Sequence, residues 1–253
     1  MSYNFKVSFF DDEIQVSSFP SIITKGGETH EKTVVSPAES SVTCDSDSVG
    51  SSESSVDNAF RSLRRTKQSI YKVARANDWD FFCTFTLKDS YRYDYLESRK
   101  KLCKWFNNFK SRHCKDLQYI VVPEFHKDGA IHFHALIQSK QIVPLLSKRW
   151  CNNKKYYLPL YNLGISEIEH VKDRYRVSNY ICKYITKELT NVNGKQRYFR
   201  SQGLKLPKEL EYLAENQSLL EFIEANFPQY QIVHSKTGEF DSCYVQLKIA
   251  DTE

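Results

Sequence analysis

The stretch Pro123-Glu124-Phe125-His126-Lys127-Asp128-Gly129-Ala130-Ile131-His132-Phe133-His134-Ala135-Leu136-Ile137 contains two strand-like runs separated by a turn at Lys127-Asp128-Gly129. Successive side chains of a strand point to opposite faces, so His132 and His134 share one face of the second run. The other face carries apolar side chains, namely Ile131, Phe133, Ala135 and Ile137. One face therefore offers core and the other offers two imidazoles, which a metal ion can bind. The stretch predicts a β-hairpin with a metal-binding face.

The length of the turn decides which side chains join the histidines. A three-residue loop, Lys127-Asp128-Gly129, with its glycine in the left-handed conformation, places Glu124 directly opposite His132. A two-residue loop shifts the register by one residue and turns Glu124 to the other face. We predict the three-residue loop, because it brings two imidazoles and a carboxylate together.

The composition indicates a folded protein with reduced thiols. The chain has 253 residues, of which 40% are hydrophobic and 14% aromatic, enough for a sizeable core. It has no run of about 18 apolar residues that would span a membrane, and no basic region followed by an apolar one at its start. Its seven cysteines form no Cys-x-x-Cys pair, which argues against a zinc ribbon. We therefore expect a cytoplasmic location in the host cell.

The net charge of +5 is unevenly distributed along the sequence. Residues 1–57 contain three lysines and ten Asp and Glu residues, a net charge of −7. The remaining residues therefore carry +12. A strongly basic region of this kind favours a polyanionic partner, most simply nucleic acid.

The order of apolar patterns along the chain predicts an α+β fold, with a central antiparallel sheet that carries the histidines and is flanked by helices. Residues 1–57 are expected to form a disordered, acidic, serine-rich tail. Residues 58–253 are expected to form one domain, with its core at about 78–206 and a C-terminal extension of helix and strand. Strands are expected at 80–87, 117–125, 130–138 and 165–170, with two more within 230–249. Helices are expected at 58–76, 93–111, 139–150, 173–189 and 207–227.

The helix expected at 173–189 carries a second group of chemically active residues. Tyr-x-x-Lys occurs twice in tandem, as Tyr180 with Lys183 and Tyr184 with Lys187. Residues three and four apart share a face of a helix, so these four side chains cluster on one side. Apolar residues form a separate stripe that can bury against the sheet.

These residue types suit phosphodiester transesterification. A tyrosine hydroxyl has a pKa near ~10, so it requires activation to attack at neutral pH. A nearby ammonium stabilises the phenolate, and a divalent metal polarises the phosphoryl group under attack. The phenolic oxygen would attack phosphorus, release a 3′-hydroxyl and leave a 5′-phosphotyrosine link.

Three motifs in this order resemble those of a known family. They are Phe82-Cys-Thr-Phe-Thr86, His132-Phe-His134 and Tyr180-Ile-Cys-Lys-Tyr-Ile-Thr-Lys187. Together they resemble the HUH endonucleases, specifically the rolling-circle replication initiators of the filamentous-phage and related plasmid type. The resemblance covers about 78–206.

The resemblance implies a role for each matching residue and for partners of the protein. It implies a divalent metal, Mn²⁺ or Mg²⁺, held by His132, His134 and Glu124. It implies two tyrosine nucleophiles with a basic companion, namely Tyr180, Tyr184 and Lys183. The DNA partner would be single-stranded DNA or an origin hairpin. The Gly-x-x-x-x-Gly-Lys-Ser/Thr loop of a helicase is absent from the sequence, so a host helicase and polymerase are expected as partners.

Several alternatives stay open at this point. His126 is the rival third metal ligand to Glu124, and neither tyrosine ranks above the other. Basic residues near the tyrosines are candidates for DNA contact, namely Lys187, Arg197 and Arg200. The same chemistry would serve a plasmid relaxase or a single-strand transposase. A non-catalytic nucleic-acid-binding module is the alternative of a different class.

Overall fold

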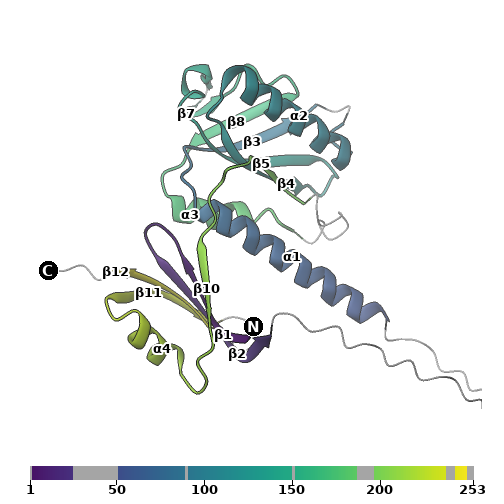
Figure 1. Cartoon of the computed structure of the whole chain (residues 1–253). Coiled ribbons are helices and arrows are strands. Elements are labelled where there is room, and N and C mark those ends of the chain that lie inside the picture. Colours follow the sequence, from purple (N-terminus) through teal and green to yellow (C-terminus); the bar gives the residue numbers. More distant parts are fainter. Residues whose placement is uncertain are drawn as a thin grey trace, which may run out of the picture. The chain divides into compact units, whose positions relative to one another are not determined.

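The computed structural model describes residues 2–24, 51–88, 91–149, 152–186, 197–237 and 243–249, with the backbone alone at 51–57, 149 and 152–154. These residues form two compact units (Figure 1). The central unit consists of the described residues from 51 to 206. The terminal unit combines residues 2–24 with those described from 207 onward. None of the helices in the described part of the chain is long and apolar enough to span a membrane.

The central unit is built on a seven-stranded antiparallel sheet of order β6-β7-β8-β3-β5-β4-β9. The strands are β3 (Phe81–Leu87), β4 (Gln118–Phe125), β5 (Ile131–Gln138), β6 (Ser147–Arg149), β7 (Asn152–Tyr157), β8 (Gly164–His170) and β9 (Phe199–Arg200). The helices are α1 (Ser51–Arg75), α2 (Tyr95–His113) and α3 (Arg174–Cys182), with a 3₁₀ turn η1 (Val143–Leu145). The predicted α+β class with a central antiparallel sheet is confirmed.

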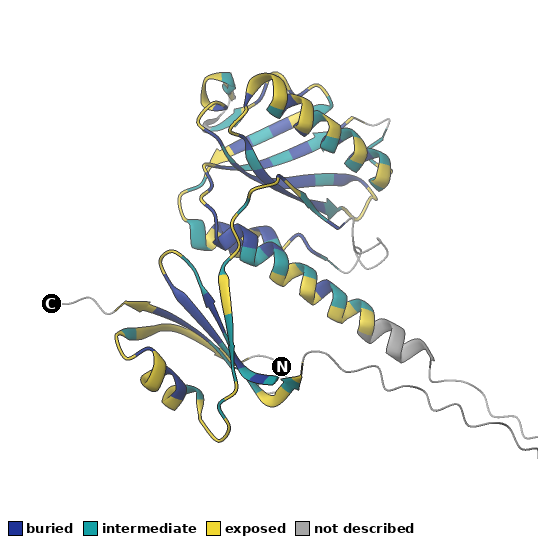
Figure 2. Ribbon diagram, viewed as in Figure 1, coloured by how far each residue is buried: buried dark blue, intermediate teal, exposed yellow. Residues whose placement is uncertain are grey.

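Different helices bury the two faces of this sheet (Figure 1). On one face, Phe133 of β5 packs in a cluster with Phe106 of α2. On the other face, Leu136 of β5 packs in a cluster with Ile70 of α1 and Ile181 of α3. Burial on both faces leaves few exposed positions on the inner strands (Figure 2). The sheet is therefore a rigid platform between two helical layers.

Helices α2 and α3 begin where an aspartate caps the first turn. The Asp94 carboxylate accepts a hydrogen bond from the Glu97 backbone N–H at 3.1 Å, and Asp173 accepts one from Arg176 at 3.0 Å. A side-chain oxygen at this position satisfies a backbone donor that has no partner within the helix. These caps fix the residue at which each helix starts against the sheet.

Gly164 is required where β8 begins, and a test follows from its surroundings. A Cβ at this position would lie 2.0 Å from the Thr86 carbonyl oxygen. We expect Gly164→Ala to lower the free energy of unfolding by about 3 kcal/mol, because backbone must move to relieve the clash. Gly203→Ala is the matched control, since Gly203 has a φ of +82° but open space around it. It should cost about 1 kcal/mol. Equal losses in denaturant unfolding would contradict the prediction.

The terminal unit is a five-stranded antiparallel sheet of order β10-β1-β2-β12-β11 with one helix. Its elements are β1 (Ser2–Phe9), β2 (Ile14–Thr24), β10 (Lys208–Tyr212), α4 (Leu219–Asn226), β11 (Tyr230–Thr237) and β12 (Cys243–Ile249). Phe5 stacks on Phe222 with ring centroids 4.2 Å apart, in a core that also contains Val16 and Leu247. The core thus joins both ends of the described chain.

The prediction of a disordered tail at 1–57 is wrong for residues 2–24, which form β1 and β2. These strands pair with β10 and β12, nearly 200 or more residues later in the chain, so no local pattern revealed their partners. The expected single domain at 58–253 is likewise replaced by two units. The part of the predicted tail at 25–50 lies outside the described residues.

Three predicted helices also differ from the structure. The segment 139–150 forms η1 and β6, and the segment 207–227 forms β10 before the shorter α4. The helix expected at 173–189 ends at Cys182 as α3, and residues 187–189 lie outside the described part. Pro144 and Pro207 lie in stretches whose local pattern indicates a helix, and sheet pairing decided the outcome there. The strands predicted within 230–249 are confirmed as β11 and β12.

Candidate metal and tyrosine site

The hairpin between β4 and β5 has the predicted three-residue loop. The His126 N–H donates to the Ala130 carbonyl at 2.9 Å, and Gly129 has a φ of +83°. Only this register places Glu124 opposite His132, as the strand pairing shows. The predicted turn and the predicted register are confirmed.

The histidines face the side of the sheet covered by α1 and α3. His132 and His134 alternate with Phe133, whose side chain belongs to the opposite core. On the neighbouring strand β3, Thr86 pairs with His132 and Thr84 pairs with His134. The Thr84 hydroxyl lies 3.2 Å from Nδ1 of His134 and holds that ring in place. Alternation along β3 indicates only packing for Thr84, and this contact adds the orientation of a histidine.

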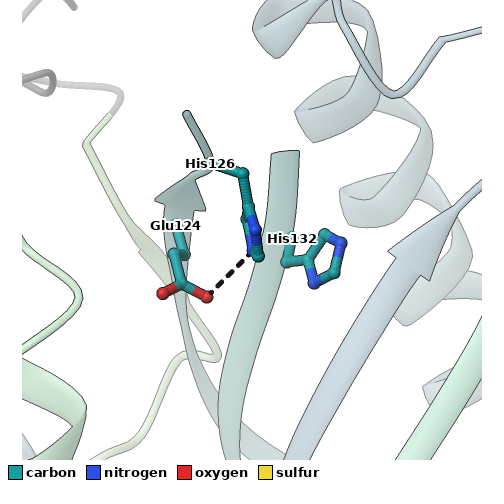
Figure 3. Close-up of side chains that lie close together, drawn as sticks. All are labelled: Glu124, His126 and His132. Carbon is teal, nitrogen blue, oxygen red and sulfur yellow. Dashed lines mark ion pairs between the residues drawn. The ribbon is translucent and has the colours of Figure 1, made fainter. Parts of the chain in front are cut away.

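Glu124 is the centre of the polar cluster on this face. Its Oε2 lies 2.6 Å from Nε2 of His134 and 3.3 Å from Nε2 of His126. One ligand atom from each of Glu124, His126 and His132 lies within 4.8 Å of the others (Figure 3). One carboxylate therefore contacts or neighbours three imidazoles.

The cluster fits a divalent cation by the chemistry of its donors. Two imidazoles and a carboxylate suit Mn²⁺ and related metals of intermediate softness. Glu124 and His132 are two of the three predicted ligands, and His126, the rival, completes the converging group. His134, the other predicted ligand, instead bonds Glu124 through the nitrogen that would face a metal. Its role as a ligand stays a prediction.

Burial favours the neutral form of both predicted histidine ligands. Removal from solvent is the main cause that lowers the pKa of His132, and the neighbouring His126 lowers it further. Burial also lowers the pKa of His134, against the opposing effect of its hydrogen bond to Glu124. A neutral imidazole is the form that binds a metal. The site therefore keeps its nitrogen donors available at neutral pH.

In the metal-free chain, we expect the free energy of unfolding to fall as the pH drops below 6.5, the ordinary pKa of these histidines. The folded pKa values are lowered, so the unfolded chain binds protons first and acid favours unfolding. Stability is full above that value and is lost as the pH falls toward the lowered pKa values. Denaturant unfolding in EDTA, at about pH 5.5 and about pH 7.5, measures the effect. His134→Gln should flatten the dependence, and an unchanged dependence would contradict it.

The tyrosines lie at the end of α3 and just after it. Tyr180 is in the helix and 46% exposed, whereas Tyr184 follows the helix end and is only 8% exposed. After Cys182 the backbone tightens, with the Tyr184 N–H bonded to the Ile181 carbonyl at 3.4 Å. This tightening departs from the regular helix that the sequence predicted. It turns the second tyrosine inward toward the sheet.

Aromatic contacts bring the tyrosines onto the histidine face. The Tyr184 ring stacks on the His134 ring with centroids 3.6 Å apart and planes at 17°. Tyr180 contacts Tyr184 edge to face at 5.4 Å, and Phe82 of β3 contacts Tyr180 at 5.3 Å. The histidine motif and the tyrosine motif, about 50 residues apart in sequence, therefore form one site.

The two tyrosines differ in their ability to ionise. Burial, a hydrogen bond with Tyr180 and the negative charge of Glu124 all raise the pKa of Tyr184. These three causes disfavour the phenolate of the inner tyrosine in the metal-free chain. Lys183 places its ammonium 5.8 Å from the centroid of the Tyr180 ring. The exposed tyrosine therefore has the basic companion that the sequence assigned to the pair.

The predicted DNA-contact residues have different positions. Arg197 is 4% exposed and donates to the hydroxyls of Ser62 at 2.9 Å and Thr66 at 3.3 Å on α1. This burial corrects its predicted role, because its guanidinium anchors a helix instead of facing solvent. Arg200 is exposed on the edge strand β9, where its contact with DNA stays a prediction. Lys187 lies outside the described residues.

Comparison with known proteins gives one match. The family model of the replication-associated protein ORF2 matches residues 80–189 of this chain. The match spans β3 through the tyrosine segment and so includes the histidines and both tyrosines. Curated proteins gave no match to the chain. The similarity supports a role in replication initiation and, with it, an interaction with DNA.

Proposed function

We propose that this protein is a metal-dependent, single-strand DNA endonuclease and strand transferase that initiates rolling-circle replication. The observation that carries the proposal is the stacking of Tyr184 on His134, at 3.6 Å, beside Glu124. It places a tyrosine pair against a group of metal-binding side chains on one face of a rigid sheet. The similarity to replication-associated proteins over 80–189 supports DNA as the substrate.

The arrangement assigns a task to each group at the site. Glu124, His126, His132 and His134 supply donors for a divalent cation, which when bound would polarise the scissile phosphate. The exposed Tyr180 hydroxyl is accessible to a phosphate of DNA, and Lys183 beside it stabilises negative charge. As the phenolic oxygen loses its proton and bonds to phosphorus, the bond to the 3′-oxygen breaks. The product is a 5′-phosphotyrosine and a free 3′-hydroxyl.

A pair of tyrosines also suits the joining half of the reaction. While Tyr180 holds one DNA end covalently, Tyr184 remains within contact, at 5.4 Å between ring centroids. A second transesterification can then release the first end without hydrolysis. The energy of the phosphodiester bond is conserved throughout, so strand joining requires no nucleotide cofactor.

The test is the covalent adduct. Single-stranded oligonucleotides tiled across the DNA that encodes the chain would be incubated with the protein and Mn²⁺, then run on a denaturing gel. A shifted band that requires Mn²⁺ and disappears in the Tyr180→Phe/Tyr184→Phe double variant supports the proposal. Tight binding of one oligonucleotide without any adduct would overturn it and favour a non-catalytic binding module.

A further inference from the structure

A second site lies on the outer side of α2, away from the histidines and tyrosines. A pocket of about 350 Å³ opens between α2 and the segment 158–163 that leads into β8. Helix α2 covers the sheet face opposite to the one that carries the histidines, because its Phe106 packs with Phe133. The pocket is therefore separated from the candidate metal site by the thickness of the sheet.

The charge of this pocket is entirely positive or neutral. Lys101, Lys104, Arg112 and His113 line it, and its lining contains no carboxylate. Lys101 is partly neutralised by Glu97, at 3.2 Å. Lys104 and Arg112 are exposed, and neither has an ion pair within the described residues. A site that gathers unneutralised cations of this kind favours a phosphate-bearing ligand.

The floor of the pocket is apolar and fixed. Trp105 stacks on Phe109 with ring centroids 4.9 Å apart, and its indole N–H donates to the Leu160 carbonyl at 3.3 Å. Leu160 is 42% exposed at the rim. A half-exposed indole held in this way is a preformed surface for a base or a sugar. Cations beside a fixed aromatic surface are the combination that binds single-stranded nucleic acid.

The spacing along α2 fits a strand rather than a single phosphate. Lys104 and Arg112 are eight residues apart on the helix, about 12 Å along its axis, so each can contact a different phosphate of one strand. The segment 158–163 is also tied to the end of β3, through the bond from the Lys88 N–H to the Leu163 carbonyl at 2.9 Å. Thr86 at that end pairs with His132, so one wall of the pocket lies at the same end of the sheet as the metal site.

We propose that this pocket binds single-stranded DNA that continues from the cleavage site around the end of the sheet, with phosphates on Lys104 and Arg112 and a base against Trp105. The proposal rests on the proposed function for the identity of the ligand. The pocket would hold the strand at a second point, so that the DNA next to the cleavage site stays bound during joining.

The test compares two double variants of the full chain. Lys104→Gln/Arg112→Gln removes both pocket cations, and Lys100→Gln/Lys115→Gln removes two exposed cations next to them that do not line the pocket. Affinity for a long single-stranded oligonucleotide is measured by fluorescence anisotropy over a range of salt. The pocket variant should bind about tenfold more weakly, with the slope of log K against log salt smaller by about 1.4. Equal losses in both variants would overturn the proposal.

Two further measurements distinguish binding in this pocket from a general loss of affinity for DNA. Oligonucleotide binding should quench tryptophan fluorescence, and Trp105→Phe should remove most of that quenching. If the pocket variant instead loses affinity for a hairpin duplex and keeps it for single strands, the proposal is wrong. A short oligonucleotide that spans the cleavage site alone should form adduct equally well with the pocket variant. Absence of adduct in the wild-type protein would refute the proposed function, while the binding comparison would still decide the pocket.

Discussion

Replacing Tyr180 with phenylalanine should reduce the first cleavage of single-stranded DNA by about 10³-fold or more, whereas Tyr184→Phe should reduce it by less than about tenfold. The two side chains are four residues apart and share the same repeated motif, but only Tyr180 is substantially exposed. Burial and the charge of Glu124 raise the pKa of Tyr184, so its phenolate is the harder one to form. The measurement is the initial rate of covalent adduct formation in Mn²⁺ on a denaturing gel.

The joining reaction provides the complementary test of this ranking. With adduct already formed on Tyr180, transfer to a second oligonucleotide should be slowed in Tyr184→Phe more than the first cleavage is. The circular dichroism spectra of both variants serve as the control, since phenylalanine keeps the ring contacts with His134 and Phe82. A larger loss of first cleavage in Tyr184→Phe than in Tyr180→Phe would reverse the assignment.

Glu124→Gln should weaken Mn²⁺ binding by about 10²-fold and abolish adduct formation at Mn²⁺ concentrations that saturate the wild-type protein. Glu124 is the negatively charged member of the converging group, and its Oε2 contacts both His134 and His126. The substitution keeps the shape of the side chain but removes the charge that a divalent cation requires. Calorimetric titration with Mn²⁺ measures the affinity directly, independently of DNA.

The matched control for this prediction is Glu167→Gln. Glu167 lies on β8 directly across from Thr84, and its carboxylate pairs with Lys155 at 3.0 Å. The same chemical change one strand away from the site should alter Mn²⁺ affinity by less than about twofold, because a half-exposed ion pair contributes little. Comparable losses in the two variants would indicate a general charge effect and contradict a metal site centred on Glu124.

The sequence predicted the candidate site well because its geometry is set locally. Alternation along β5 fixes which face His132 and His134 share, and the Asp128-Gly129 turn fixes the register that adds Glu124. The same reasoning did not distinguish the tyrosines. Their difference arises where α3 ends, at a tightening of the backbone that depends on packing of Tyr184 against His134. Regular periodicity carries no signal for such an ending.

Other differences arise from contacts between distant parts of the chain. Arg197 lies in a basic segment typical of a nucleic-acid contact, but its guanidinium bonds Ser62 and Thr66, about 130 residues earlier. The strands β1 and β2 were missed for a similar reason, since each has a pairing partner in the last fifth of the chain. Local patterns predict which residues suit a strand, whereas long-range pairing decides whether one forms.

The terminal sheet imposes an order on the synthesis and folding of the chain. Its strand order interleaves β1 and β2 between β10 and β12, so the central unit is inserted within it. The earliest strands to leave the ribosome cannot complete their sheet until nearly all later residues have been made, whereas the central unit is contiguous and can fold first. Until then Phe5 and Val16 have no core to enter. A ribosome that stalls before β10 would release a protein with a complete candidate site and two unpaired, aggregation-prone strands.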